Sequence, residues 1–238
     1  MNVAAQKIRD ERSLLGQFVW LVSRRPQHVL RALYTYFQFS LASILRWIPS
    51  ARWHGVTLGE NVRLQRNSSI MAERPQGKIA IGSHAIVYEH AKVEAYGQGV
   101  IEIGEASILG EIQIVSRHHV SIGKRFLSSW NVFIQDYDSH PVSQSSRRAQ
   151  VQRMAATFRP RFRSKAPLHA PEYSWNFPGE EIVIGDDVWI GANATILKGA
   201  RIGSGSIVAT AAVVLKGEYP PRSLIAGNPA VVVKEVCE

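Results

Sequence analysis

The sequence predicts a mainly β protein, in which short parallel strands stack as a three-sided prism after an N-terminal helical segment. Three observations predict this fold. An aliphatic residue recurs every six positions, a small side chain recurs four positions after it, and one long loop interrupts the pattern before it resumes. Neither the 3.6-residue period of a helix nor the two-residue period of a plain strand produces that spacing.

The first element, residues 1–52, is a basic and apolar helical segment. It holds eight Lys and Arg residues against two acids, a surplus of six within a net charge of +9. Its run "ALYTYFQFSLASIL" is shorter than the roughly 20 apolar residues that span a bilayer. Flanking Arg and Trp residues suit a membrane interface, so we expect residues 1–50 to make a peripheral membrane contact. A helical cap on the rest of the protein is the alternative.

The start of the chain also bears on its location. "MNVAAQKIRDERSLLG" carries charge where a signal peptide needs an apolar core. We therefore expect a cytoplasmic protein, peripheral on the inner face of the membrane if the N-terminal segment binds lipid.

The second domain, residues 53–238, carries the hexads. Each hexad is expected to form one strand and one corner, with its lead residue pointing inward and a small residue at the crowded corner. Three hexads would make one coil of about 18 residues, and coils would stack about 4.8 Å apart. The clearest lead residues are Ile184, Ile190, Ile196, Ile202, Val208 and Val214, and the small ones are Val188, Ala194, Ala200, Ser206 and Ala212. The same phase gives upstream leads at Ile81, Val87, Val93, Ile103, Leu109, Val115, Ile122, Ser128 and Ile134.

The stretch "VFIQDYDSHPVSQ" ends the first run of hexads. Six residues after Ile134 comes His140, where the next inward lead residue would fall. An inserted loop without hexads follows at 142–178, and its basic residues precede the first acid, Glu172. Such a loop could close over a site and attract an anionic substrate, or it could be a solvated excursion. Residues 218–238 form a C-terminal extension.

These motifs carry a family resemblance. "DDVWIGANATILKGARIGSGSIVAT", the closing "PPRSLIAGNPAVVVKEV" and the His-Pro pair resemble the left-handed β-helix acyltransferases of the maltose, galactoside and xenobiotic O-acetyltransferase group. The resemblance covers about residues 56–236. It implies left-handed coils, a homotrimer, and acetyl-CoA as co-substrate in the cleft between neighbouring prisms.

The resemblance implies that His140 is the general base, and its chemistry agrees. A neutral imidazole is well suited to take the proton of a sugar hydroxyl that attacks a thioester. Direct transfer is expected, because the lone Cys237 lies outside every motif and no serine occupies a nucleophile elbow. Asp136 and Asp138 could orient the imidazole or hold the acceptor; equally, they could cap the turn.

Cofactor contacts are implied position by position, with one departure: Val231 stands where the family has Lys or Arg. Small residues would let the pantetheine chain approach the backbone, and cations would meet the nucleotide phosphates. The implied contacts are Trp189 beside the cofactor arm, Gly191, Ala192 and Thr210 along the pantetheine, and Lys216 and Lys234 near the phosphates.

Acceptor contacts transfer less well. Leu109 and Arg117 stand where the galactoside enzymes have Asn and Asp, so a simple galactoside is not expected. Arg117, Asn131 and Asp138 are the expected acceptor contacts. Our hypothesis is O-acetylation of a cell-surface glycan or its lipid-linked precursor, such as an O-antigen or capsule unit.

Other functions remain open. The chain could acylate a smaller acceptor, a maltose-like sugar or an antibiotic, or it could be a catalytically silent scaffold. Zinc β-helices of the γ-carbonic anhydrase type use three histidines, but that pattern is not reproduced, so we expect no metal. Lipid A acyltransferases that use an acyl carrier protein share the prism but lack "SHPV" followed by a long loop and "VWIG", so this chain does not match them. A pI near 9.9 without a recognition motif gives no reason to expect nucleic acid. The histidines considered for zinc are His84, His90, His118 and His119.

Overall fold

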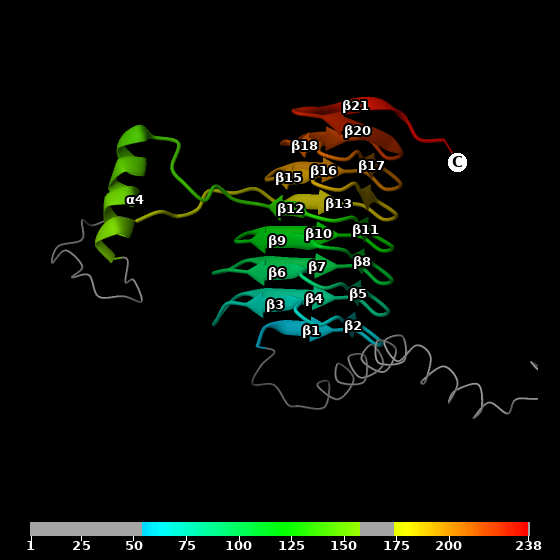
Figure 1. Ribbon diagram of the computed structural model, residues 1–238, viewed down its shortest axis with the longest axis horizontal. Coiled ribbons are helices and arrows are strands. Elements are labelled where there is room, and N and C mark those ends of the chain that lie inside the picture. Colours follow the sequence, from blue (N-terminus) through cyan, green and yellow to red (C-terminus); the bar gives the residue numbers. More distant parts are fainter. Residues whose placement is uncertain (1–53, 158–173, 238) are drawn as a thin grey trace, which may run out of the picture. The chain divides into compact units, whose positions relative to one another are not determined.

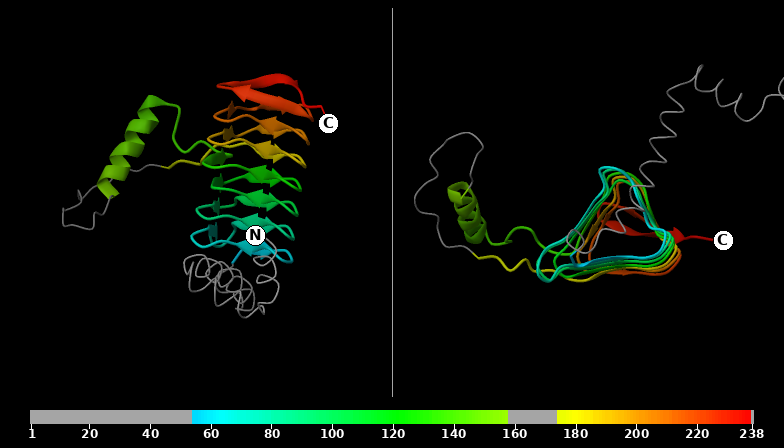
Figure 2. Two further views of the ribbon diagram at one scale, coloured as in Figure 1. Left: turned by 45° about the vertical axis from the view of Figure 1, so that its right-hand side comes forward. Right: turned by 90° about the horizontal axis from the view of Figure 1, so that it is seen from below.

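The computed structural model describes residues 54–157 and 174–237, and their strands wind into a left-handed parallel β-helix (Figure 1). Each turn of the chain adds one strand to each of three parallel sheets, and the coils superimpose as a triangle when seen end-on (Figure 2). The predicted fold class and handedness are therefore confirmed. The expectations for residues 1–52 lie outside the described residues.

We name the three faces sheets A, B and C. Sheet A contains β1 (Val56–Leu58), β4 (Lys78–Ile81), β7 (Val100–Ile103), β10 (His119–Ile122), β13 (Ile182–Ile184), β16 (Ala200–Ile202) and β19 (Gly217–Tyr219). Sheet B contains β2 (Arg63–Leu64), β5 (Ile86–Val87), β8 (Ile108–Leu109), β11 (Leu127–Ser128), β14 (Trp189–Ile190), β17 (Ile207–Val208), β20 (Ser223–Gly227) and β21 (Ala230–Glu235). Sheet C contains β3 (Ser69–Ala72), β6 (Lys92–Ala95), β9 (Ile112–Ser116), β12 (Val132–Gln135), β15 (Thr195–Leu197) and β18 (Val213–Val214).

The core is the stack of lead residues inside the prism. From Ile184 to Val214 every lead residue is at most 2% exposed, and the small residues between them are buried as well. Stacked leads pair in register, as Ile134 does with Ile196. The C-terminal extension adds β21, which pairs antiparallel with β20 at one end of sheet B. The hexad pattern thus identified the stacked lead and small residues of the core from Ile184 to Val214.

One upstream lead position was wrong. Ile114, not Val115, pairs with Val93 and belongs to the core cluster. The corner between β8 and β9 is one residue short, so the phase shifts there. The N–H of Gly110 at this corner donates to the Ser128 hydroxyl at 2.9 Å, which gives a buried polar lead position a partner.

The hexad phase also does not extend to His140. Strand β12 ends at Gln135, and the His140 side chain is exposed instead of pointing inward. The chain leaves the prism here, at the corner where sheet C passes to sheet A, and resumes at β13. We call this segment, residues 136–181, the excursion. It contains a helix, α4 (Gln144–Thr157), which the lack of a hexad pattern did not predict.

No helix among residues 54–157 and 174–237 is long and apolar enough to cross a membrane.

Candidate active site

The two ends of the excursion are joined to each other where they leave the prism. Tyr137 and Gly179 form an antiparallel bridge, and the N–H of Asp138 donates to the carbonyl of Pro178 at 2.8 Å. The outgoing and returning segments therefore start from one fixed root. His140 follows that root by only a few residues.

Gly179 is required at this root by close approach. A Cβ at Gly179 would lie 2.3 Å from the carbonyl oxygen of Asp136 and 2.3 Å from Cδ2 of His118. The next N–H, of Glu180, donates to the same Asp136 oxygen at 2.9 Å. Contacts this close exclude any side chain at position 179, so the end of the excursion packs directly against the backbone of Asp136 and the ring of His118.

Asp136 anchors the corner from inside. Its carboxylate is fully buried and accepts the Ser116 hydroxyl at 2.6 Å. It also accepts the backbone N–H groups of Arg117 at 2.9 Å and His118 at 3.1 Å. Three donors on one buried carboxylate satisfy a corner that would otherwise hold unpaired polar groups. Asp136 therefore fixes the backbone of the preceding coil, and the three groups that donate to its carboxylate do not include the His140 ring.

Arg117 lies among aromatic rings that include one from each end of the excursion. Its guanidinium carbon is 3.8 Å from the Phe177 ring centroid, 5.4 Å from that of Tyr96 and 5.5 Å from that of Tyr137. Burial, followed by the Glu94 carboxylate, raises the pKa of Tyr96, so the ring facing the cation is a neutral phenol. Cation–π contacts of this kind stabilise the root. The acceptor contact expected of Arg117 stays a prediction.

Asp138 has a partner that the sequence did not indicate. Its carboxylate is 2.6 Å from Nζ of Lys198, at the corner of the next coil, and both side chains are about one-third exposed. The Trp175 ring N–H donates to the Asp138 carbonyl at 3.0 Å. Asp138 therefore faces the lysine and not the imidazole, and its expected contact with the acceptor is untested. No motif marked Lys198, because it becomes a neighbour only when coils stack.

His140 is held by a residue of helix α4. Its Nδ1 lies 2.9 Å from Oε1 of Gln150, and the side chain remains exposed. The residues before it are also fixed, since Nε2 of Gln135 donates to the Tyr137 carbonyl at 2.6 Å and to the Ser139 hydroxyl at 2.9 Å. An exposed imidazole on a fixed segment can meet a bound substrate.

The residues implied for the cofactor arm gather around sheet B. Trp189 projects from the outer face of β14, is 46% exposed, and donates its ring N–H to Ser129 at 3.2 Å. Gly191 and Ala192 form the corner between sheets B and C, and Thr210 lies at the same corner one coil later. A Cβ at Gly191 would lie 2.6 Å from the Thr210 nitrogen, so coil stacking alone requires that glycine.

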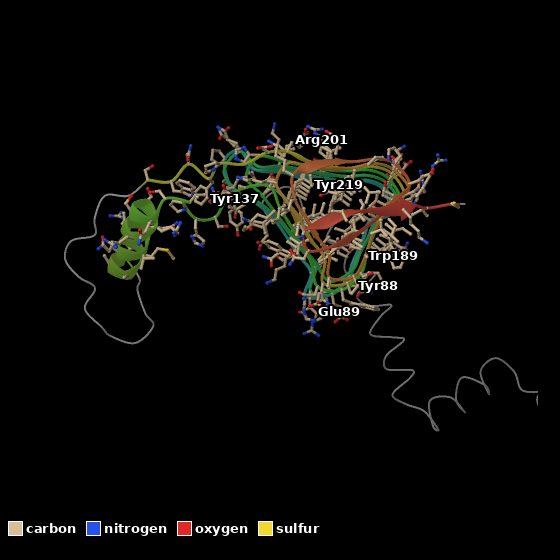
Figure 3. The ribbon with its side chains drawn as sticks, turned by 90° about the horizontal axis from the view of Figure 1, so that it is seen from above. Tyr88, Glu89, Tyr137, Trp189, Arg201 and Tyr219 are labelled. Atoms are coloured by element: carbon tan, nitrogen blue, oxygen red, sulfur yellow. The ribbon has the colours of Figure 1, made fainter. Side chains whose placement is uncertain are left out.

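The implied phosphate-binding lysines do not lie together. Nζ of Lys216, at the corner between sheets C and A, is 2.7 Å from the Glu180 carboxylate. Lys234 is exposed on β21, opposite Leu224 of β20. Figure 3 shows Tyr137, which marks the excursion root, at one corner of the triangle, and Trp189 on a side of the triangle away from that corner. The six implied cofactor residues therefore occupy two corners and one sheet face of a single chain.

Asn131 is exposed at the corner between sheets B and C. Its side-chain amide donates to Asn193 of the next coil at 2.8 Å, and both residues have positive φ angles, 53° and 58°. Asparagine tolerates this left-handed conformation, so the pair has a structural reason to be there. Its expected contact with the acceptor is untested.

The histidines considered for zinc have separate partners. Nε2 of His118 lies 2.9 Å from the Phe177 carbonyl, while His119 lies between the carboxylates of Glu181 at 2.7 Å and Glu102 at 3.0 Å. Across residues 54–157 and 174–237, no group of three or more His, Cys, Asp or Glu side chains is placed to hold a metal ion.

Comparisons with known proteins agree with the repeats. Residues 181–216 match the family model for the bacterial transferase hexapeptide (six repeats). The chain is 28% identical to a protein of Escherichia coli (strain K12) named as a lipopolysaccharide biosynthesis O-acetyl transferase, WbbJ, over 68% of this chain and 74% of that one.

Two further matches are more limited. A tetrahydropyridine-dicarboxylate N-acetyltransferase of Staphylococcus aureus (strain JH9) is 49% identical, but over only 24% of this chain and 23% of its own length. Among solved structures, the polysialic acid-specific acetyltransferase NeuO aligns over 76% of this chain and 81% of its own, with 21% identity and a TM-score of 0.45.

Proposed function

We propose that this chain, whose residues 181–216 match the bacterial transferase hexapeptide model, is an acetyl-CoA-dependent O-acetyltransferase that acts on a cell-surface glycan or its lipid-linked precursor. The observation that carries the proposal is His140, an exposed imidazole that follows a rigid root on a hexapeptide prism. The similarity to a lipopolysaccharide biosynthesis O-acetyl transferase over about two-thirds of the chain supports the acceptor class.

In the proposed reaction, His140 acts as the general base of a direct transfer. The acceptor hydroxyl oxygen attacks the thioester carbonyl carbon while its proton passes to the imidazole. The carbon–sulfur bond then breaks, the acetyl ester forms, and the imidazolium returns the proton to the departing thiolate. A backbone N–H of the adjoining coil would stabilise the oxyanion.

The proposed cofactor site uses more than one copy of the chain. Because Trp189 and His140 stand at different places on the triangle, a complete site is most simply formed where a neighbouring prism packs against sheet B. The outer face of sheet B carries an in-register apolar row, which supports such a contact. The row consists of Ile86, Ile108, Leu127, Trp189, Ile207 and Leu224. We propose a homotrimer, with acetyl-CoA between neighbouring prisms.

The proposed acceptor is anionic or linked to a lipid phosphate. Arg117 is enclosed by rings, so the more accessible cations are Arg147 and Arg148, which are exposed on helix α4. These arginines follow His140 by seven and eight residues along the chain. Phosphate or carboxylate groups of an acceptor would be attracted to this helix. A peripheral membrane contact through residues 1–50 would bring a lipid-linked acceptor to the same protein.

The test measures free-thiol release from acetyl-CoA with a panel of neutral sugars, capsule and O-antigen oligosaccharides, and lipid-linked oligosaccharides. The variants are His140→Ala and a matched control, His54→Ala, which removes an exposed histidine at the beginning of the prism. We expect glycan-dependent release that His140→Ala lowers by two or more orders of magnitude while acetyl-CoA still binds, with the control unchanged. Full activity of His140→Ala would refute the assignment of the base, and failure of the wild type to bind acetyl-CoA would favour the scaffold.

A further inference from the structure

The side chain of Gln150 contacts the His140 segment with both of its polar ends. Oε1 lies 2.9 Å from Nδ1 of His140, and Nε2 lies 3.5 Å from the carbonyl oxygen of Ser139. A carbonyl oxygen can only accept a hydrogen bond, so the amide NH2 must face Ser139. The amide oxygen then faces the ring, and because it also only accepts, Nδ1 must carry a proton.

This geometry fixes which ring nitrogen is basic. A neutral imidazole has one protonated and one unprotonated nitrogen, and the partner of one decides the state of the other. With Nδ1 donating to Gln150, the lone pair lies on Nε2 of His140. We propose that Gln150 is a positioning residue that holds His140 in the Nδ1-protonated tautomer, so that Nε2 receives the proton of the acceptor hydroxyl. This inference rests on the proposed function, in which His140 is the base.

Helix α4 is tied to the segment that carries His140, so Gln150 has a defined place. The guanidinium of Arg147 donates to the carbonyls of Pro141 and Val142, and its backbone N–H donates to the carbonyl of Ser143 at 3.0 Å. The first turns of the helix are thereby fixed to the residues that directly follow His140. Gln150, one helical turn later, is partly buried and aims back at the ring.

A neutral partner has a different effect from the carboxylate that often orients a histidine. An amide oxygen orients the ring and stabilises the imidazolium modestly, whereas a carboxylate adds a full opposite charge. Charged groups near this segment include Arg147 and Arg148 on α4 and the Asp138–Lys198 ion pair at the root. Gln150 therefore orients the ring without placing an opposite charge against Nδ1.

Two readouts test the inference on the full chain. The first is the tautomer of His140, read from long-range proton–nitrogen correlation spectra of protein labelled with ¹⁵N-histidine, where His140→Ala identifies the signal. The second is the pH profile of kcat and kcat/KM for acetyl transfer. The variants are Gln150→Ala and Gln150→Glu, with Gln152→Ala and Gln152→Glu as matched controls on the same helix, where Gln152 is exposed.

We expect the wild type to show the Nδ1-protonated form, and Gln150→Ala to shift the ring towards the Nε2-protonated form. With this variant kcat should fall about tenfold, less than the roughly 10²–10⁴-fold that a general base contributes, because the imidazole itself remains, while KM for acetyl-CoA stays constant. Gln150→Glu should keep the tautomer and restore most of kcat. It should also move the acidic limb of the profile to higher pH by about one unit, because a carboxylate favours the charged ring. The Gln152 variants should match the wild type.

The outcomes separate this inference from the proposed function. If His140→Ala is inactive but Gln150→Ala keeps both the wild-type tautomer and the wild-type kcat, the positioning role is wrong and the base assignment stands. A Gln150→Ala variant that loses activity without a change in tautomer also overturns the inference. If His140→Ala is fully active, the proposed base itself is wrong, whatever the Gln150 variants do.

Discussion

Replacing Asp136 by alanine should destabilise the protein more than any exposed charge substitution. The side chain is fully buried, and its removal takes away the acceptor of three hydrogen bonds, from Ser116, Arg117 and His118. A hydrogen bond to a charged group contributes about 1.5–3 kcal/mol. We take the low end, because two of the donors are only partly buried. Three bonds at about 1.5 kcal/mol each give a loss of about 4–5 kcal/mol.

Asp136→Asn should fall between the wild type and Asp136→Ala. One oxygen remains to accept a hydrogen bond, but the new NH2 group is a donor that faces other donors. The matched control is Asp187→Ala, which removes an exposed carboxylate paired with Arg125 at 2.6 and 2.7 Å. Despite its two short bonds, that exposed pair should matter far less, because solvent screens it and both side chains lose freedom in forming it.

The assay is urea unfolding followed by circular dichroism, at one fixed protein concentration because the stability of the proposed trimer would depend on concentration. A loss near 4 kcal/mol would be a large fraction of the roughly 5–15 kcal/mol that stabilises a typical domain. If Asp136→Ala loses no more stability than Asp187→Ala, the assignment of Asp136 as the anchor of the corner is refuted.

Two further predictions concern surface groups of the prism. Side-chain hydrogen bonds from Lys124 and Arg125 lower the pKa of Glu105 and Asp187, respectively, so their stabilisation is present above the unfolded values of about 4 and is lost as pH falls through the lower folded values. The double variant Glu105→Gln with Asp187→Asn should therefore flatten the acid side of the stability curve, modestly and less so in high salt; an unchanged slope would contradict this. Leu127→Glu, in the apolar row of sheet B, should shift the particle from trimer to monomer in sedimentation experiments without loss of β signal, and a wild-type monomer would contradict the proposed assembly.

The sequence predicted the prism because the hexad pattern is local. The six-residue spacing alone indicates that a lead residue such as Ile190 is buried, since no helix or simple strand has that period. The pattern fails where a corner changes length, since Val115 and Ile114 are both aliphatic and only the register decides which points inward. A one-residue deletion at a corner has no signature in composition.

The site was predictable only in part, for a related reason. His140 was marked by its motif, but its partner Gln150 lies on a helix whose sequence has no clear apolar face. The partner of Asp138 was also unpredictable, because Lys198 meets it only through coil stacking. A contact that depends on the length and path of an inserted segment has no periodic signature in the sequence.

Opening a β-helix to insert a segment creates a problem of hydrogen bonding that this chain solves at the corner. Within intact coils, a corner N–H donates to a carbonyl of the next coil, as Tyr96 does to Ser116 at 2.8 Å. At the excursion the main chain turns outward, so the N–H groups of Arg117 and His118 reach the Asp136 carboxylate instead. Because Asp136 is the first residue of the excursion, these hydrogen bonds also hold the backbone that leads to His140. Asp136 therefore contributes both to the stability of the opened corner and, together with Gln135 and Gln150, to the placement of the proposed base. Asp136→Asn should lower both the midpoint of urea unfolding and the rate of thiol release, and an unchanged rate in a destabilised variant would contradict this link.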